Sequence, residues 1–271
     1  MGINSFSQET ITEEQLDEVI ITSSRIDLPF SENSRTITVI SSEDIKESTA
    51  TNVADLLQSI SGIDVRRRGT DGMQSDLYIR GGQFNQTLIL IDGFKTEDPQ
   101  TGHHTMNMMI PLENIERIEI IKGPAARVFG QNAFSGAINI VTKSNVQEKL
   151  KLDAGGGSYD KLRLGVTAAT NLEKSNHFVN FEYNGSQGYM ENTDYENLNY
   201  FLKSSILTKH QPIDVIATFI DRKFGANNFY TNNPDYDEYE ETQTSLVGVS
   251  TSILKNNWTF KPKLYWKRGQ D

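Results

Sequence analysis

The chain has 271 residues, with 26 Lys and Arg against 36 Asp and Glu, a net charge of -10 and no cysteine. This acidic balance disfavours nucleic-acid binding, which needs clustered Lys and Arg against the phosphates. Without cysteine, disulfides, thiolate nucleophiles and Cys-based zinc sites are excluded. No run approaches the roughly 20 apolar residues of a membrane helix. A membrane β-barrel stays open, because its strands alternate apolar and polar residues and have an unremarkable mean hydropathy.

The first 34 residues are predicted to form a flexible tail, because they are mostly polar and acidic and show no core-forming period. Residues 17–22 (DEVIIT) interrupt this tail with a short β-prone run. Two interpretations apply to it: the first edge strand of the next domain, or a free strand that a partner captures by strand addition.

Residues 35–142 have the pattern of a compact α+β domain. One helix is predicted to begin at Ser41 or Ser42, since both can cap it and acidic residues follow. A second helix is predicted over residues 52–59, ended by Gly62. The predicted strands cover residues 36–40, 63–65, 77–80, 87–91, 115–121 and 137–142.

From residue 143 to 271 the pattern changes to strands of period two with no helix between them. Short turns, the first at residues 155–158, are combined with two long loops, residues 185–196 and 222–241. This rhythm is typical of an outer-membrane barrel, of which we expect the first six to seven strands here. The predicted strands cover residues 149–154, 162–168, 178–183, 200–207, 213–220, 245–254 and 258–266. Aromatic residues near strand ends are either membrane-girdle or ordinary core residues: Tyr159, Phe178, Tyr200, Trp258 and Trp266.

Several segments in order and spacing resemble the TonB-dependent outer-membrane receptor family, and the resemblance covers essentially the whole chain. They are Ser61-Gly62-Ile63, Ile79-Arg80-Gly81, residues 88–93 (LILIDG), residues 115–124 (IERIEIIKGP) and residues 129–142 (FGQNAFSGAINIVT). The resemblance also makes residues 17–22 a TonB box, formed by Asp17, Glu18, Val19, Ile20, Ile21 and Thr22.

The resemblance implies an α+β plug domain followed by the N-terminal antiparallel strands of a transmembrane β-barrel, truncated in this sequence. It implies a non-enzymatic receptor in the outer membrane of a Gram-negative cell, in contact with its lipid, with the plug inside the barrel and the tail in the periplasm. The TonB–ExbB–ExbD complex would supply energy for uptake of an organometallic ligand. Cobalamin, haem and ferric siderophores are the candidates, and cobalamin-type receptors of the Bacteroidetes kind are closest in style. The alternative is a docking receptor that works with a surface lipoprotein to capture oligosaccharide or peptide.

The resemblance further assigns roles to individual plug residues. Arg80 and Lys122 would anchor the plug by pairing with carboxylates of the barrel wall, since buried charges need partners; an ordinary solvated side chain is the alternative. Several glycines, Gly93 among them, would allow tight turns or close approach to that wall.

Plug loops near the extracellular mouth would contact the ligand, in residues 67–75, 82–86 and 98–106. The candidate contacts are Arg67, Arg68, Gln83, Asn85, His103 and His104. Two neighbouring imidazoles can ligate haem iron or another metal, although polar loop contacts are the alternative. No resident cofactor is required. The acidic residues of 191–196 and 235–241 offer oxygen ligands for Ca²⁺ without EF-hand spacing, and a solvated loop is the alternative.

Overall fold

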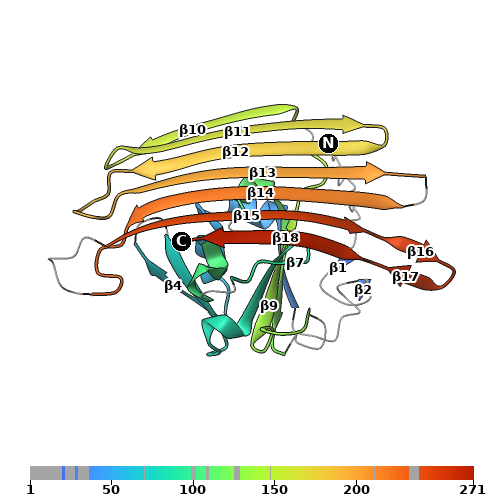
Figure 1. Ribbon diagram of the computed structural model, residues 1–271, viewed down its shortest axis with the longest axis horizontal. Helices are drawn as coiled ribbons and strands as arrows, with labels where there is room; N and C mark the ends of the chain where they lie inside the picture. Colours follow the sequence, from blue (N-terminus) through green and yellow to red (C-terminus); the bar gives the residue numbers. More distant parts are fainter. Residues whose placement is uncertain are drawn as a thin grey trace, which may run out of the picture.

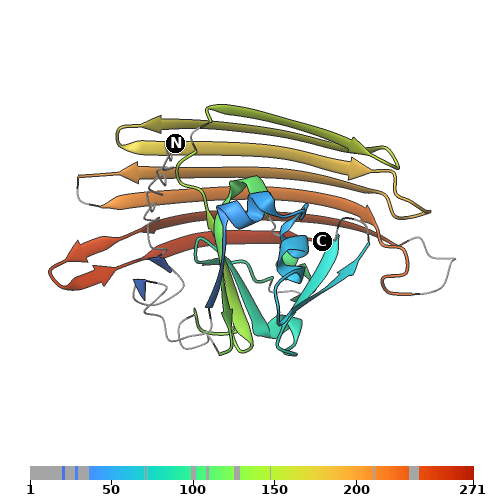
Figure 2. The ribbon, with the colours of Figure 1, turned by 180° about the vertical axis from the view of Figure 1, so that it is seen from behind.

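The computed structural model describes residues 20–21, 28–29, 37–69, 71, 73–98, 102–107, 110–124, 129–146, 148–209, 211–231 and 238–271. It contains a plug domain that lies against one face of a broad antiparallel sheet, which we call the wall sheet (Figure 1). In the view from behind, the helices of the plug lie on the same face of the wall sheet as the plug strands (Figure 2). Among the described residues, no helix has the length and apolar character needed to cross a membrane.

The plug is built on a five-stranded sheet in the order β3-β8-β9-β6-β7. Its strands are β3 (Ile37–Ser41), β6 (Thr87–Ile91), β7 (Phe94–Lys95), β8 (Ile115–Lys122) and β9 (Gly136–Thr142). Every residue of β6 is buried, and β6 pairs with β9 in parallel while the other pairs are antiparallel. Near-continuous Ile and Leu is typical of strands covered on both faces. A hairpin of β4 (Ile63–Arg68) and β5 (Gln74–Ile79) packs beside this sheet.

Two short helices of the plug begin where the sequence predicts. In α1 (Ser42–Glu47) the Ser41 hydroxyl accepts a hydrogen bond from Asp44 N, and the Asp44 carboxylate accepts one from Ser41 N. In α2 (Val53–Gln58) Asn52 is the N-cap. The predicted end of α2 is wrong, because its C-cap is Ser59 and Gly62 belongs to the following turn, at φ +82°. The described part of the plug also contains three short 3-10 turns: η3 (Phe84–Gln86), η4 (Gly102–Asn107) and η5 (Leu112–Asn114).

The wall sheet has seven strands, all paired antiparallel with their neighbours in the sheet. They are β10 (Leu150–Gly157), β11 (Lys161–Leu172), β12 (Ser175–Ser186), β13 (Tyr195–Leu207), β14 (Pro212–Gly225), β15 (Tyr239–Thr251) and β18 (Lys263–Gln270). A small hairpin, β16 (Ile253–Lys255) with β17 (Trp258–Phe260), extends the end of β15 and β18. The described residues of the long loops, 187–194, 226–231 and 238, lie at one end of the sheet, and the turns at 173–174, 208–209 and 256–257 lie at the other.

Three local predictions for the wall sheet are corrected by the structure. Residues 155–157 continue β10, because glycine tolerates the extended backbone, and the turn comes after them. The strand expected over residues 258–266 is divided at Pro262, which has no N–H for a ladder bond. Phe178 is 4 % exposed and packs into the core that the plug shares with the wall, so it is no girdle residue.

Candidate functional site: the interface between plug and wall sheet

The wall sheet has an apolar outer face and a polar inner face, which is the inverse of a water-soluble sheet. In β13, Leu202 points outward and is 39 % exposed, whereas its neighbour Lys203 points toward the plug and is 7 % exposed. Valine, leucine and aromatic residues of adjacent strands continue the outer face, including Val166, Val179, Phe181, Tyr200, Phe219, Val247 and Trp266. This alternation is that of a strand with lipid on one side and a polar lumen on the other.

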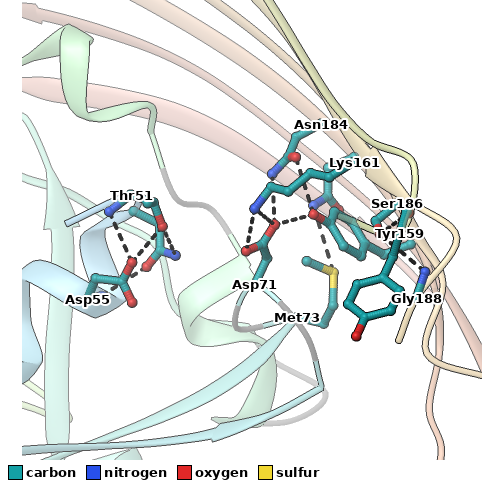
Figure 3. A network of polar contacts seen from close by, with 12 residues as sticks. Thr51, Asp55, Asp71, Met73, Tyr159, Lys161, Asn184, Ser186 and Gly188 are labelled. Atoms are coloured by element: carbon teal, nitrogen blue, oxygen red, sulfur yellow. Dashed lines mark hydrogen bonds and ion pairs between the residues drawn. The ribbon is translucent and has the colours of Figure 1, made fainter. Parts of the chain in front are cut away.

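One plug carboxylate, that of Asp71, is bound by three neighbouring wall strands (Figure 3). Lys161 Nζ of β11 lies 3.0 and 2.8 Å from its two oxygens, and Asn184 Nδ2 of β12 lies 3.4 Å from Oδ2. The Tyr195 hydroxyl of β13 also donates to Asp71 Oδ2. Asp71 has a left-handed backbone, φ 50°, so the chain is turned to present this side chain to the wall.

Met73 extends the same attachment. Its carbonyl accepts a hydrogen bond of 3.1 Å from Arg222 Nη1 of β14, and its side chain packs with Tyr195 and Phe224. Asp71 and Met73 are therefore tied to four consecutive strands at the end of the sheet that carries the long loops. The sequence predicts this segment at the extracellular mouth, and the structure places it at the long-loop end.

A second attachment lies deeper in the interface. Arg163 Nη2 of β11 is 2.7 Å from Glu113 Oε1 of the plug and 3.0 Å from Glu182 Oε2 of β12. Lys143 Nζ donates to the Glu113 carbonyl at 2.7 Å. Burial, reinforced by the charge of Lys46, lowers the pKa of Lys143.

A third attachment centres on Asp92, which lies between β6 and β7. Its carboxylate accepts hydrogen bonds from Thr142 N at 2.8 Å and Thr142 Oγ1 at 2.5 Å, and pairs with Lys203 Nζ at 3.0 Å. Lys263 Nζ of β18 donates to the Asp92 carbonyl at 2.6 Å. A Cβ on Gly93, at φ +76°, would lie 2.0 Å from Lys263 Nζ, so the glycine allows the close approach predicted for it.

A fourth attachment joins β18 to the segment after β7. Lys267 Nζ donates to the carbonyls of Thr96 at 2.9 Å and Glu97 at 2.7 Å, and lies 3.5 Å from Asp98 Oδ2. In the described part of the chain, four plug carboxylates thus pair with wall cations: Asp71, Asp92, Asp98 and Glu113.

The two predicted anchoring residues lie elsewhere. Lys122 Nζ donates to the Ser61 carbonyl at 2.7 Å, a contact within the plug, and Arg80 is exposed with φ 50°. Their pairing with wall carboxylates stays a prediction. The anchors that the structure shows were missed, although a signal existed: Arg163 and Lys203 alternate with apolar residues in strands whose other face is lipid-facing.

The predicted ligand contacts are divided between plug-internal and interface positions. Arg67 pairs with Asp55 of the plug, while Arg68 Nη1 donates to the Phe229 carbonyl of a long loop at 3.0 Å. The backbone of Gln83 donates to the Gln86 side chain at 3.0 Å, and Gln83 and Asn85 are both exposed.

The two predicted histidines have different surroundings. His103 Nδ1 lies 2.8 Å from Asp76 Oδ1, and its ring stacks on Phe84 with centroids 4.3 Å apart. His104 is half-buried in the same turn. Within the described ranges, no group of three or more His, Cys, Asp or Glu side chains is placed to hold a metal ion.

The two long loops contact each other through side-chain amides. Asn192 Nδ2 donates to the Glu238 carbonyl at 2.7 Å, and Asn227 Nδ2 donates to the Glu191 carbonyl at 2.9 Å. Residues 232–237 lie outside the described ranges, and calcium binding by these loops stays a prediction.

The predicted TonB box is described only at Ile20–Ile21 (β1), which pairs antiparallel with Leu28–Pro29 (β2). Asp17, Glu18, Val19 and Thr22 lie outside the described residues. Among the described residues, β1 and β2 form a separate two-stranded sheet. The plug sheet begins, in sequence, with its edge strand β3.

A comparison with protein families identifies this arrangement. Residues 29–137 match the family model of the TonB-dependent Receptor Plug Domain. The matched region is a plug domain of the TonB-dependent receptor kind. The predicted plug domain and the antiparallel strands that follow it are confirmed.

Curated and solved relatives agree with this family. The chain is 33 % identical over 156 residues to the vitamin B12 transporter BtuB of Vibrio vulnificus. The aligned region covers 56 % of this chain and 25 % of that protein. In fold it is similar to P. aeruginosa FpvA bound to pyoverdines (TM-score 0.75, 20 % identity, 91 % of this chain and 35 % of that chain). It is also similar to the ferric yersiniabactin uptake receptor FyuA of Yersinia pestis (TM-score 0.72, 17 % identity, 88 % and 41 %). The chain therefore spans about a quarter of the length of the curated relative.

Proposed function

We propose that this chain belongs to an energy-coupled transporter of the Gram-negative outer membrane that takes up a scarce, large, metal-bearing ligand. The observation that supports this best is the plug itself, which is ion-paired against the polar inner face of lipid-facing strands. A lumen filled by a folded domain does not conduct a large solute at rest. Uptake therefore requires work on the plug, and that work has to come from outside the outer membrane.

Cobalamin is the ligand that we propose first, with haem and ferric siderophores as competitors. The sequence relative is named a vitamin B12 transporter, whereas the fold relatives are named for ferric siderophores. The sequence match is the more specific of the two, because the solved structures are 20 % identical or less.

Growth on each limiting nutrient tests this proposal. A strain without its own receptors, expressing the full-length receptor, is supplied with limiting cyanocobalamin, haem or a ferric siderophore. We expect growth on cyanocobalamin, and loss of growth when TonB is deleted. Growth on haem or a siderophore alone would reassign the ligand, and growth on none of the three would contradict uptake of this ligand class.

We propose that the TonB–ExbB–ExbD complex captures residues 17–22 by strand addition. Affinity in this mode comes from backbone hydrogen bonds, which proline cannot donate. Ile20→Pro is expected to abolish uptake while ligand still binds at the cell surface, and Ile20→Ala is the matched control that keeps the N–H. Normal uptake by the proline variant would contradict the TonB-box assignment.

Energy dependence separates transport from the docking alternative. Collapse of the proton-motive force with an uncoupler should stop accumulation of ligand and leave surface binding intact. A docking receptor that works with a surface lipoprotein would capture its ligand equally well in both conditions. The relatives' names as transporter and uptake receptor favour the first outcome.

A further inference from the structure

Two cavities lie between the plug and the wall sheet. Strands β10, β11 and β12 line both of them, and β13 and β14 line one of them as well. The outer cavity, toward the long loops, has a volume of about 220 Å³ and is lined by Asp71, Lys161, Arg163 and Glu182, among others. The inner cavity, toward the short turns, has a volume of about 690 Å³ and is lined by Lys143, Thr167 and Phe178, among others.

The cavities follow one another along the inward-facing rows of the wall. On β11, residues Lys161 and Arg163 line the outer cavity and Thr167 lines the inner one. On β12, Glu182 lines the outer cavity and Phe178 the inner one. Since a strand rises about 3.3 Å per residue, four residues separate the two linings by about 13 Å.

The barrier between the cavities is the 3-10 turn η5. Leu112 lines both cavities, and Glu113 lines the inner one while pairing with Arg163 of the outer one at 2.7 Å. The turn therefore closes the space between them with one leucine side chain and one ion pair.

This barrier is less completely hydrogen-bonded than the Asp92 anchor. Within the described residues, Glu113 Oε2, Arg163 Nε and both amide atoms of Asn114 are buried without a hydrogen-bond partner. By contrast, Lys203 Nζ contacts three oxygens between 2.8 and 3.0 Å. A buried polar group without a hydrogen-bond partner costs free energy, and a water molecule would supply the missing bond. Contact with water therefore favours movement of η5 more than movement of the Asp92 anchor.

We propose that the transport path of this receptor runs between η5 and strands β11 and β12, and that Leu112 with the Glu113–Arg163 ion pair is its gate. This inference rests on the proposed transport function. The path is lined by amides and charges of both signs, including Asn52, Asn184 and Asn197, so it suits a cargo that carries hydrogen-bonding groups such as carboxamides on its periphery. The plug opens along one face while its Asp92 and Lys203 contact stays closed.

Ion conductance tests the gate without any ligand. The purified full-length receptor is placed in planar lipid bilayers, with K⁺ and Cl⁻ as probes. Glu113→Gln keeps the size of the side chain and removes the ion pair, and is expected to produce a several-fold increase in current over the native receptor. Asp92→Asn is the matched control, because it weakens a more buried plug–wall ion pair. It is expected to stay as silent as the native receptor.

General loosening of the plug would make Asp92→Asn leak at least as much as Glu113→Gln, and that result would overturn the proposal. So would the absence of extra current in Glu113→Gln. Neither conductance outcome depends on which ligand the receptor takes up.

Cross-linking tests the same gate during transport. Because the chain has no cysteine, the pair Glu113→Cys with Arg163→Cys introduces the only two thiols in it. Joining them with a cleavable bifunctional thiol reagent should stop uptake of labelled cyanocobalamin, and cleavage should restore it. The control pair, Asp92→Cys with Lys203→Cys, should transport whether joined or not. Equal block of both pairs would mean that the plug moves as a whole, and transport through the joined gate pair would place the path elsewhere. If the native receptor takes up no cyanocobalamin, the proposed ligand fails and the conductance comparison still decides the gate.

Discussion

The plug sheet buries mainly apolar side chains, whereas the wall sheet, built in the same chain, buries charged and polar side chains together with apolar ones. In β6 of the plug, Leu90 is 2 % exposed, whereas in β13 of the wall Leu202 is 39 % exposed and Lys203 only 7 %. The plug is stabilised by the burial of apolar side chains, which is favourable wherever the surrounding solvent is water. It is held to the wall partly by apolar packing against residues such as Phe178 and Phe201, and partly by ion pairs and hydrogen bonds, which water can replace one at a time. The plug can therefore stay folded while its polar contacts with the wall sheet are replaced by contacts with water.

The largest effect is expected when the wall loses a buried cation. Lys203→Met leaves the Asp92 carboxylate without its charge partner, which should lower the free energy of unfolding of the plug by about 3–5 kcal/mol. Chemical denaturation of the receptor in detergent, followed by a probe in the plug, measures this change. The exposed Lys255→Met is the control, and an equal change in both variants would contradict an anchoring role for Lys203.

The apolar core of the plug should respond somewhat less. Ile118, fully buried in β8, loses its packing in Ile118→Ala, which should cost about 3 kcal/mol. Leu164→Ala on the outer face of the wall, where the side chain is 42 % exposed, should leave the unfolding of the plug unchanged in the same assay. If Leu164→Ala were as costly, the two sheets would not differ as described.

A steric clash introduced between the plug and the wall sheet should lower the free energy of unfolding by a smaller amount. A Cβ at Gly248 of β15 would lie 2.8 Å from the ring of Phe94, so Gly248→Val should force the plug away from the wall and cost about 2 kcal/mol. Gly155→Val is the comparison, because nothing lies within 4 Å of its Cβ position. Thermal unfolding should show a lower midpoint for Gly248→Val alone.

The smallest effect, and the one that depends on pH, concerns the start of α2. Burial opposes ionisation of Asp55, but hydrogen bonds from Thr51 and the charge of Arg67 outweigh it and lower the pKa of Asp55 below its ordinary 3.8. Asp55→Asn should therefore cost about 1 kcal/mol at neutral pH. Because the folded pKa is depressed, this cost is fully present above pH 3.8 and is lost as the pH falls through the folded pKa. A difference between native and variant stability that grows on acidification would contradict this account.

Local signals in the sequence were sufficient for the elements and their order. The capping serine of α1 and the alternation after residue 143 each depend on neighbours within a few residues, so they could be predicted. The end of α2 and the division of the last strand at Pro262 were missed although their causes are local, a C-cap at Ser59 and a proline without an N–H. The burial of Phe178 could not be decided locally, because it depends on packing against the plug.

By itself, the sequence determined a plug-like α+β domain followed by strands with one apolar face. These features could be predicted because hydrophobic periodicity and turn residues are visible within short stretches of sequence. Only the tertiary structure decided which charges hold the plug. Arg80 and Lys122 were predicted as anchors, yet the pairs observed join plug carboxylates to Lys161, Arg163, Lys203 and Lys267 of the wall. An ion pair depends on which residues, 50 or more positions apart, come within a few ångströms. That distance is set by the register of the wall strands and by the way the plug sheet lies against them.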